Sequence, residues 1–97
     1  MNERIQVLEE AIKILETDGW CQGQMKNEQG HYCLKGAVRK ARSNLGFVGE
    51  DPVWLIHNQL KVEGSMAGTV HYNDYIAKDK RYVIRLLRRT INANSQG

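Results

Sequence analysis

Four segments of the chain carry hydrophobic residues at helical spacing. They are residues 3–17, 34–44, 52–62 and 80–93. In the first segment the inner face is formed by residues three or four positions apart, namely Ile5, Leu8, Ile12 and Leu15. Charged residues occupy the opposite faces, as expected of amphipathic helices that pack on a core. The pattern therefore predicts about four helices.

Residues that start or stop helices lie at the ends of these segments. Gly19, Gly46 and Gly64 follow the first three segments, and glycine readily takes the backbone conformation found just past a helix end. Asp51-Pro52 and Asp79 precede the last two segments. An aspartate at that position accepts the unpaired amide hydrogens of a first helical turn. These signals support the predicted boundaries.

The segment between the first two predicted helices has no helical period. Residues 20–25 are followed by a turn-rich stretch, 26–30, and then by residues 31–33. This order predicts a short, irregular β-hairpin. Because an isolated pair of strands is only marginally stable, we expect Trp20 and Tyr32 to pack against the helices. Residues 65–78 form the least regular stretch of the chain, and we expect a loop there.

The predicted fold is mainly α, a compact bundle of about four helices with a small two-stranded β-hairpin. A chain of 97 residues is long enough for one domain and can bury a modest core. We therefore expect a single domain over residues 1–97, with an ordered core of about residues 3–91. The polar tail, residues 92–97, has nothing to bury and is expected to fray.

The composition is that of an ordinary globular protein, with 41% hydrophobic and 26% charged residues. No stretch approaches the roughly 20 apolar residues of a membrane helix. The first residues also lack the apolar stretch of a signal peptide. We therefore predict a cytoplasmic protein without a membrane partner, in which Cys21 and Cys33 are reduced. The sequence leaves the oligomeric state open.

The charge is distributed unevenly, although the net charge is only +3. Residues 3–18 contain five acidic and two basic residues, whereas residues 35–42 contain four basic residues and no acidic one. Residues 78–89 contain six basic residues and one acidic residue. This asymmetry bears on the partners of the protein rather than on its fold.

Several short motifs occur in order along the chain. They are Gly19-Trp20-Cys21-Gln22-Gly23, Cys33-Leu34-Lys35-Gly36-Ala37, Tyr72-Asn73-Asp74 and Leu86-Leu87-Arg88-Arg89. In these motifs the chain resembles a family of small bacterial and phage proteins classed as a domain of unknown function. That family carries Gly-Trp-x-Gln-Gly, Cys-x-x-Gly-Ala and Trp-Asn-Asp…Leu-Leu-Arg-Arg segments. This chain has Tyr72 where the family usually has tryptophan. The resemblance implies a bacterial cell or a phage-infected host as the setting, and it implies no activity.

Cys33 is the candidate nucleophile for an enzymatic function. It precedes a predicted helix, whose amino end lowers the pKa of a thiol, and His31 or His71 could act as its base. However, free cysteine is among the residue types most often buried, so a cysteine-dependent enzyme is a secondary interpretation. Cys21, His31 and Cys33 lack the C-x-x-C spacing and the fourth ligand of a metal site. No metal and no other cofactor is therefore predicted.

The remaining motif residues are expected to be structural. Asn73 and Asp74 could orient a catalytic base, but such side chains more often bond nearby backbone amides and hold turns. Trp20 is interpreted as a core anchor. Gly36, in the first turn of a helix, permits a close backbone approach. The sequence also leaves open a small-molecule pocket lined by Trp20, Tyr32 and Tyr72.

The favoured function is a small non-enzymatic binding module, such as a phage-type inhibitor or modulator of a host protein in a defence system. The expected contact face consists of Arg81, Arg85, Arg88 and Arg89, together with Arg39. Because the guanidinium fork grips carboxylates, the expected partner is a protein with an acidic surface. Nucleic-acid binding by the same basic helix face is the alternative. Both expectations require guanidinium groups that stand together on the outside of the helix without internal acidic partners.

Overall fold

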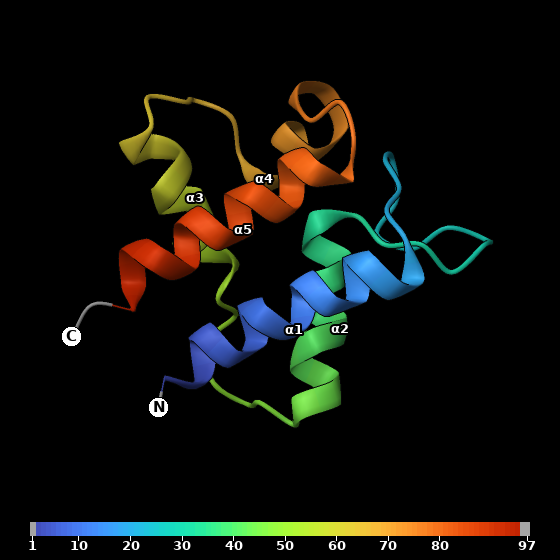
Figure 1. Cartoon of the computed structure of the whole chain (residues 1–97), viewed down its shortest axis with the longest axis horizontal. Coiled ribbons are helices and arrows are strands. Elements are labelled where there is room, and N and C mark those ends of the chain that lie inside the picture. Colours follow the sequence, from blue (N-terminus) through green and yellow to red (C-terminus); the bar gives the residue numbers. More distant parts are fainter. Residues whose placement is uncertain (1, 96–97) are drawn as a thin grey trace.

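The computed structural model describes residues 2–95 and is built from helices joined by loops (Figure 1). The elements in chain order are α1 (Glu3–Asp18), α2 (Leu34–Leu45), α3 (Val53–Val62), α4 (Thr69–His71), the π-helical turn η1 (Tyr72–Ile76) and α5 (Lys80–Asn94). Helices α1 and α5 lie side by side and run in opposite directions, with α2 behind α1 and α3 behind α5 (Figure 1). The prediction of a mainly α fold is confirmed.

The core is centred on α1, which is buried along two sides. Its fully buried residues include Val7, Leu8, Ala11 and Leu15. The apolar face of α2 covers one side of α1, and the apolar face of α5 covers the other. Helix α3 packs in turn on α5. The wide apolar stripe of α1 therefore serves two neighbouring helices.

The helix ends follow the capping signals in the sequence. Helix α1 ends at Asp18, after which Gly19 takes a positive φ of 100°. The carboxylate of Asp79 accepts a hydrogen bond from the backbone amide of Arg81 at 2.9 Å and caps α5. The Asp51 carboxylate likewise accepts from the amide of Val53 at 3.0 Å, at the start of α3. The four predicted helical segments are thus confirmed to within about one residue.

The predicted β-hairpin is wrong. Residues 2–95 contain no β-strand, and the segment between α1 and α2 is a loop with two isolated bridges at Tyr32. One bridge pairs Tyr32 with Lys26 in the antiparallel sense, and the other pairs it with Trp20 in the parallel sense. The chain therefore turns twice, and Tyr32 lies between the segment at Trp20 and the segment at Lys26. The antiparallel pairing stops after one residue pair, so no hairpin forms. Tyr32 is nevertheless buried in the core and Trp20 packs against it, as expected.

The expectation of a loop over residues 65–78 is also wrong in part. This stretch contains α4 and η1, where the amide of Ala77 donates a hydrogen bond to the carbonyl of Tyr72 at 2.8 Å. A bond between residues five positions apart defines a π-helical turn. Such a short element has no hydrophobic period by which the sequence could reveal it. Contacts from the loop after α1, which is distant in the sequence, hold it in place.

Helix α5 continues through Asn94, so residues 92–94 of the predicted frayed tail are helical. The side chain of Asn94 donates a hydrogen bond to the carbonyl of Thr90 at 2.8 Å and supports this last turn. Gln96 and Gly97 lie outside the described residues. Within the described part of the chain, every helix is too short or too polar to cross a lipid bilayer.

Candidate functional site

The predicted arginine face lies on the outer side of α5. Its four members, Arg81, Arg85, Arg88 and Arg89, are all exposed. They fall on one side of the helix because residues three and four positions apart are neighbours on a helical surface. The buried residues of α5, among them Val83 and Leu87, point the opposite way into the core. The four arginines thus lie on the exposed side of α5, and their role as a contact face stays a prediction.

Three of these arginines have acidic partners. Arg81 pairs with Asp79 at 2.8 Å, and Arg88 pairs with Glu16 of α1 at 3.8 Å. Arg89 donates two hydrogen bonds to the Glu63 carboxylate, at 2.7 and 3.0 Å. No ion pair joins Arg85 to any residue between 2 and 95. Among the four arginines of α5, only Arg85 has no acidic partner between residues 2 and 95, as the requirement demands.

The two shortest pairs shift the pKa values of their members. Hydrogen bonds from the Arg89 guanidinium lower the pKa of Glu63, and the Glu63 carboxylate raises the pKa of Arg89. Hydrogen bonds from Arg81 lower the pKa of Asp79 in the same way. The Arg88 pair is longer, and both of its side chains are about half exposed. It is therefore the loosest of the three.

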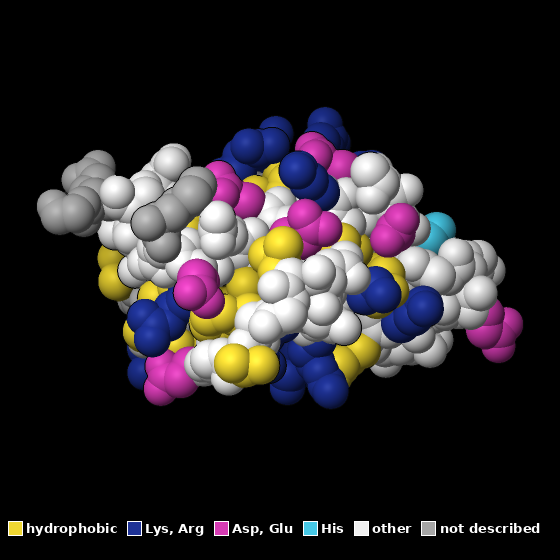
Figure 2. Space-filling model, turned by 90° about the horizontal axis from the view of Figure 1, so that it is seen from below, with side chains coloured by type: hydrophobic (Ala, Val, Ile, Leu, Met, Phe, Trp, Pro, Cys, Tyr) yellow, Lys and Arg dark blue, Asp and Glu magenta, His cyan; other side chains and the backbone are white. Residues whose placement is uncertain are grey.

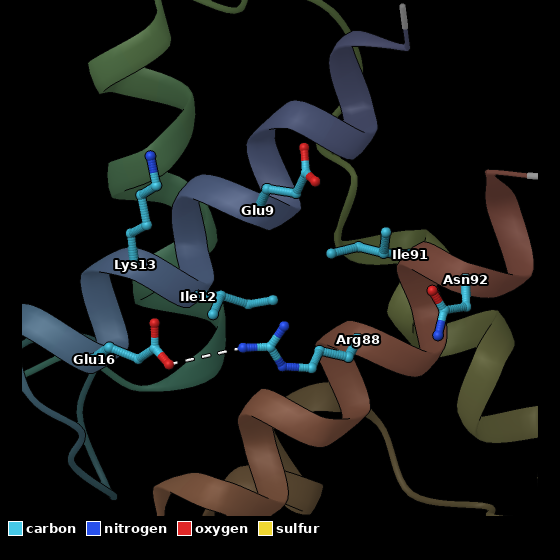
Figure 3. A pocket seen from close by; sticks show the side chains of 7 residues that line it. All are labelled: Glu9, Ile12, Lys13, Glu16, Arg88, Ile91 and Asn92. Atoms are coloured by element: carbon cyan, nitrogen blue, oxygen red, sulfur yellow. Dashed lines mark ion pairs between the residues drawn. The ribbon is translucent and has the colours of Figure 1, made fainter.

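A groove runs between α1 and α5 beside this face (Figure 3). Its volume is about 420 Å³, and its lining residues are Glu9, Ile12, Lys13, Glu16, Arg88, Ile91 and Asn92. Ile12 and Ile91 point toward each other from the two helices, and Arg88 extends toward Glu16 (Figure 3). The groove thus combines an apolar floor with charged rims, a combination suited to a partner side chain that is itself partly apolar.

On the face of the molecule drawn in Figure 2, basic residues are spread out rather than gathered in one field. Figure 2 shows lysine and arginine side chains in several separate groups, some of them next to acidic side chains. Arg39, the fifth predicted contact residue, lies on α2, where its guanidinium donates to the sulfur of Met25 at 3.7 Å. Within residues 2–95, no hydrogen bond or ion pair links Arg39 to α5. The inclusion of Arg39 in the contact face therefore stays a prediction from the sequence.

Asn73 is a buried hub that joins three segments of the chain. Its side-chain oxygen accepts hydrogen bonds from the indole nitrogen of Trp20 at 2.7 Å and from the amide of Leu34 at 3.0 Å. Its side-chain nitrogen donates to the carbonyl of Cys21 at 3.1 Å and to the carboxylate of Asp74 at 2.9 Å. The side chain is fully buried, and each polar atom makes two bonds. Asn73 therefore ties η1 to the loop after α1 and to the start of α2.

Gln22 and Asp74 complete this structural cluster. The side-chain nitrogen of Gln22 lies 3.0–3.2 Å from three carbonyls, those of Asn73 and Asp74 in the π-helical turn and that of Ala77 just after it. The Asp74 carboxylate accepts from the amide of Gly23 at 3.0 Å. Helix ends leave carbonyls without partners, and a side-chain donor satisfies them here. The structural interpretation of Asn73 and Asp74 agrees with these contacts. Sequence reasoning missed Gln22, although it lies inside the quoted Gly-Trp-x-Gln-Gly motif.

The thiol of Cys33 serves as a helix cap. Its sulfur accepts a hydrogen bond from the amide of Gly36 at 3.3 Å, and the residue is buried. Gly36 itself lies against the carbonyl of Met25, so that a β-carbon at this position would overlap the oxygen atom. The expectation that Gly36 permits a close backbone approach is thus explained by a specific neighbour.

The histidines do not assemble a catalytic or metal site with Cys33. The ring of His71, the exposed last residue of α4, lies 4.9 Å from the ring of Tyr75, which is exposed on η1. Among the described hydrogen bonds, none connects Cys33 to His31 or His71. The part of the chain between 2 and 95 also contains no group of three histidine, cysteine or acidic side chains placed to hold a metal ion.

Comparison with known proteins gives a family and no activity. A search of curated proteins and of solved structures found no significant match. Residues 1–93 match a family described only as a family of unknown function, DUF6197. This match spans every helix from α1 to nearly the end of α5. The chain therefore belongs to DUF6197, a family of unknown function.

Proposed function

We propose that this protein is a small non-enzymatic binding module that occupies an acidic surface of a partner protein. The observation that carries the proposal is the combination of Arg85, which has no acidic partner among the described residues, with the α1–α5 groove, which Arg88 lines one turn further along α5. The groove places one guanidinium group, that of Arg88, beside the apolar side chains of Ile12 and Ile91. This arrangement fits a partner segment with a carboxylate next to an apolar side chain. Interface cores favour arginine and apolar contacts of this kind.

The neighbouring ion pairs hold the arginine face in place but neutralise Arg81 and Arg89, so the contact with a partner carboxylate falls to Arg85 and Arg88. Arg81 and Arg89 are each fixed by short bonds to a carboxylate. Binding then costs less side-chain entropy than it would with freely moving arginines. The long, half-exposed pair between Arg88 and Glu16 is worth at most about 1 kcal/mol. A partner carboxylate can therefore replace Glu16 at low cost.

The proposed partner is a protein of the cell in which this chain acts. If the bacterial or phage setting implied by the family resemblance holds, we propose a cytoplasmic host protein, such as a component of a defence system. The protein would then act as an inhibitor or modulator by covering part of that protein's surface. No chemistry of its own is needed for such an action.

The test is a double charge reversal, Arg85→Glu with Arg88→Glu. Partners captured from a host extract are purified, and their dissociation constants are measured by calorimetry for wild-type and variant proteins. We expect the double variant to bind at least about tenfold more weakly, because two carboxylates would then face an acidic surface. The matched control reverses two exposed lysines elsewhere, Lys40→Glu with Lys61→Glu, and should retain binding.

Circular dichroism of the double variant must show an intact helical fold, because Arg88→Glu also places a carboxylate opposite Glu16. Unchanged affinity of a folded double variant would refute the proposed contact face. Nucleic acid is the alternative ligand, since residues 78–89 hold six basic residues and one acidic residue. A mixed-sequence DNA duplex titrated at rising salt decides this point, because phosphate contacts weaken steeply with salt.

A further inference from the structure

Each of the two cysteines follows one member of the parallel bridge between Trp20 and Tyr32. This bridge is closed by two hydrogen bonds, from the amide of Tyr32 to the carbonyl of Gly19 and from the amide of Cys21 to the carbonyl of Tyr32, both 3.0 Å long. The second bond is donated by Cys21, so the pairing of the two segments reaches the residue after Trp20. Cys21 and Cys33 are the residues that follow the bridged pair on the two segments.

This register brings the two backbones within disulfide range. Segments paired in this way lie about 4.8 Å apart. Disulfides require α-carbons roughly 4.4–6.8 Å apart. Consecutive residues of an extended segment point to opposite sides, so Cys21 and Cys33 share the side opposite to Trp20 and Tyr32. Both cysteines are buried and both are free thiols.

The electrostatics of the pair agree with this proximity. Burial raises the pKa of the Cys21 thiol, and the neighbouring Cys33 raises it further. The Cys21 sulfur lies 3.4 Å from the carbonyl of His31 and 3.5 Å from the carbonyl of Gln24. A thiol can donate its hydrogen to such carbonyls, whereas a thiolate or a disulfide sulfur cannot. The Cys21 thiol is therefore held in its protonated form.

We propose that Cys21 and Cys33 form a modification site, at which a low-molecular-weight disulfide oxidises the folded protein to an intramolecular disulfide. With oxidised glutathione as the oxidant, a thiolate of the pair attacks the glutathione disulfide and releases one glutathione. The second thiolate then attacks the mixed disulfide and releases the other. Two S–H bonds are lost and one S–S bond forms, and the two electrons and two protons reside in two molecules of reduced glutathione.

Oxidation changes the loop before α2 rather than the core. It removes the hydrogen that Cys21 directs at the carbonyls of Gln24 and His31. It also adds a covalent link between two segments that are otherwise joined by hydrogen bonds, among them those of the bridge at Tyr32. The amides of Cys21 and Tyr32, which form the bridge, are therefore expected to exchange with solvent more slowly in the oxidised protein.

The test measures the equilibrium between the folded protein and mixtures of oxidised and reduced glutathione. Free thiols are alkylated after equilibration, and intact masses then give the fractions of reduced protein, mixed disulfide and internal disulfide. Trypsin cleaves after Lys26 and separates the two cysteines, so an internal disulfide appears as two linked peptides, residues 14–26 and 27–35. The same measurement in concentrated urea gives the equilibrium for the unfolded chain.

We expect the equilibrium constant for the internal disulfide to be at least about tenfold larger in the folded protein than in urea, because the native register already places the thiols together. The Cys21→Ser and Cys33→Ser variants should give only mixed disulfides. A folded protein whose constant is equal to or below that of the unfolded chain would overturn the proposal. Accumulation of mixed disulfide alone in the folded wild-type protein would overturn it as well.

Discussion

Replacement of Asn73 by alanine should be among the most damaging single substitutions in this protein. The side chain makes four hydrogen bonds and is fully buried. Alanine at this position leaves the amide of Leu34 and the carbonyl of Cys21 without partners inside the protein. Each such buried group costs about 1–3 kcal/mol. We therefore expect the free energy of unfolding to fall by about 3–5 kcal/mol, a large share of the roughly 5–15 kcal/mol of a small domain.

Urea denaturation followed by far-ultraviolet circular dichroism measures this loss. Fluorescence is a poorer probe, because the Trp20 indole itself bonds to Asn73. The matched control is Asn58→Ala on the exposed side of α3, which should change stability by less than about 0.5 kcal/mol. The dependence of the unfolding free energy on urea concentration should stay the same in both variants. A loss below about 1 kcal/mol for Asn73→Ala would refute the hub described here.

The isosteric variant Asn73→Asp separates lost hydrogen bonds from lost volume. Aspartate keeps the acceptor used by Trp20 and Leu34, but it loses both donated bonds and places a charge beside Asp74. Burial and the neighbouring carboxylate both raise the pKa of the new carboxyl group above its unfolded value. Protonation restores a donor, so the variant should recover stability as the pH falls through that raised pKa. A deficit that is independent of pH would contradict this account.

Two further substitutions test the contacts around the site. Glu63→Gln should cost less than about 1 kcal/mol at neutral pH, because the pair with Arg89 is partly exposed. Since Arg89 lowers the pKa of Glu63, the wild-type advantage is present above the ordinary carboxyl pKa of 4.5 and disappears as the pH falls through the lower folded-state pKa. Denaturation curves of the two proteins should converge there, and a constant gap would contradict the assignment. Gly36→Ala should destabilise by about 2 kcal/mol or more, despite alanine's better helix propensity of about 1 kcal/mol, because its β-carbon meets the carbonyl of Met25. Gly68→Ala adds the same atom in open space, and equal melting temperatures for the two variants would rule out the clash.

The helices were predictable because their signals are local. The period of apolar residues in α1 and the Asp79 cap of α5 act within a few positions of the chain. The loop between α1 and α2 was not predictable in this way. Its shape depends on Asn73, which lies 52 positions from Cys21. A turn-rich segment between two short apolar runs resembles a hairpin until that distant partner is known.

The arginine face shows the same division between local and distant information. Helical spacing was enough to place Arg85 and Arg88 on one outer side of α5. The acidic partners could not be found from spacing, because Glu63 precedes Arg89 by 26 positions and Glu16 belongs to another helix. The groove residue Ile91 has the apolar character of a core position in the sequence, although it is only partly buried.

The turn at residues 27–30 has a consequence for how chain length can vary in this protein. It closes on itself, since the amide of Gly30 donates to the carbonyl of Asn27 and the amide of His31 donates to the Asn27 side chain. Insertions at this tip would leave the rest of the molecule unchanged. They would also cost little, because the entropic cost of closing a loop rises only slowly with its length. Residues 72–77 have no such freedom, because one residue more or fewer would turn the carbonyls away from Gln22. Homologous chains of different length should therefore differ at the tip and keep the spacing of the π-helical turn.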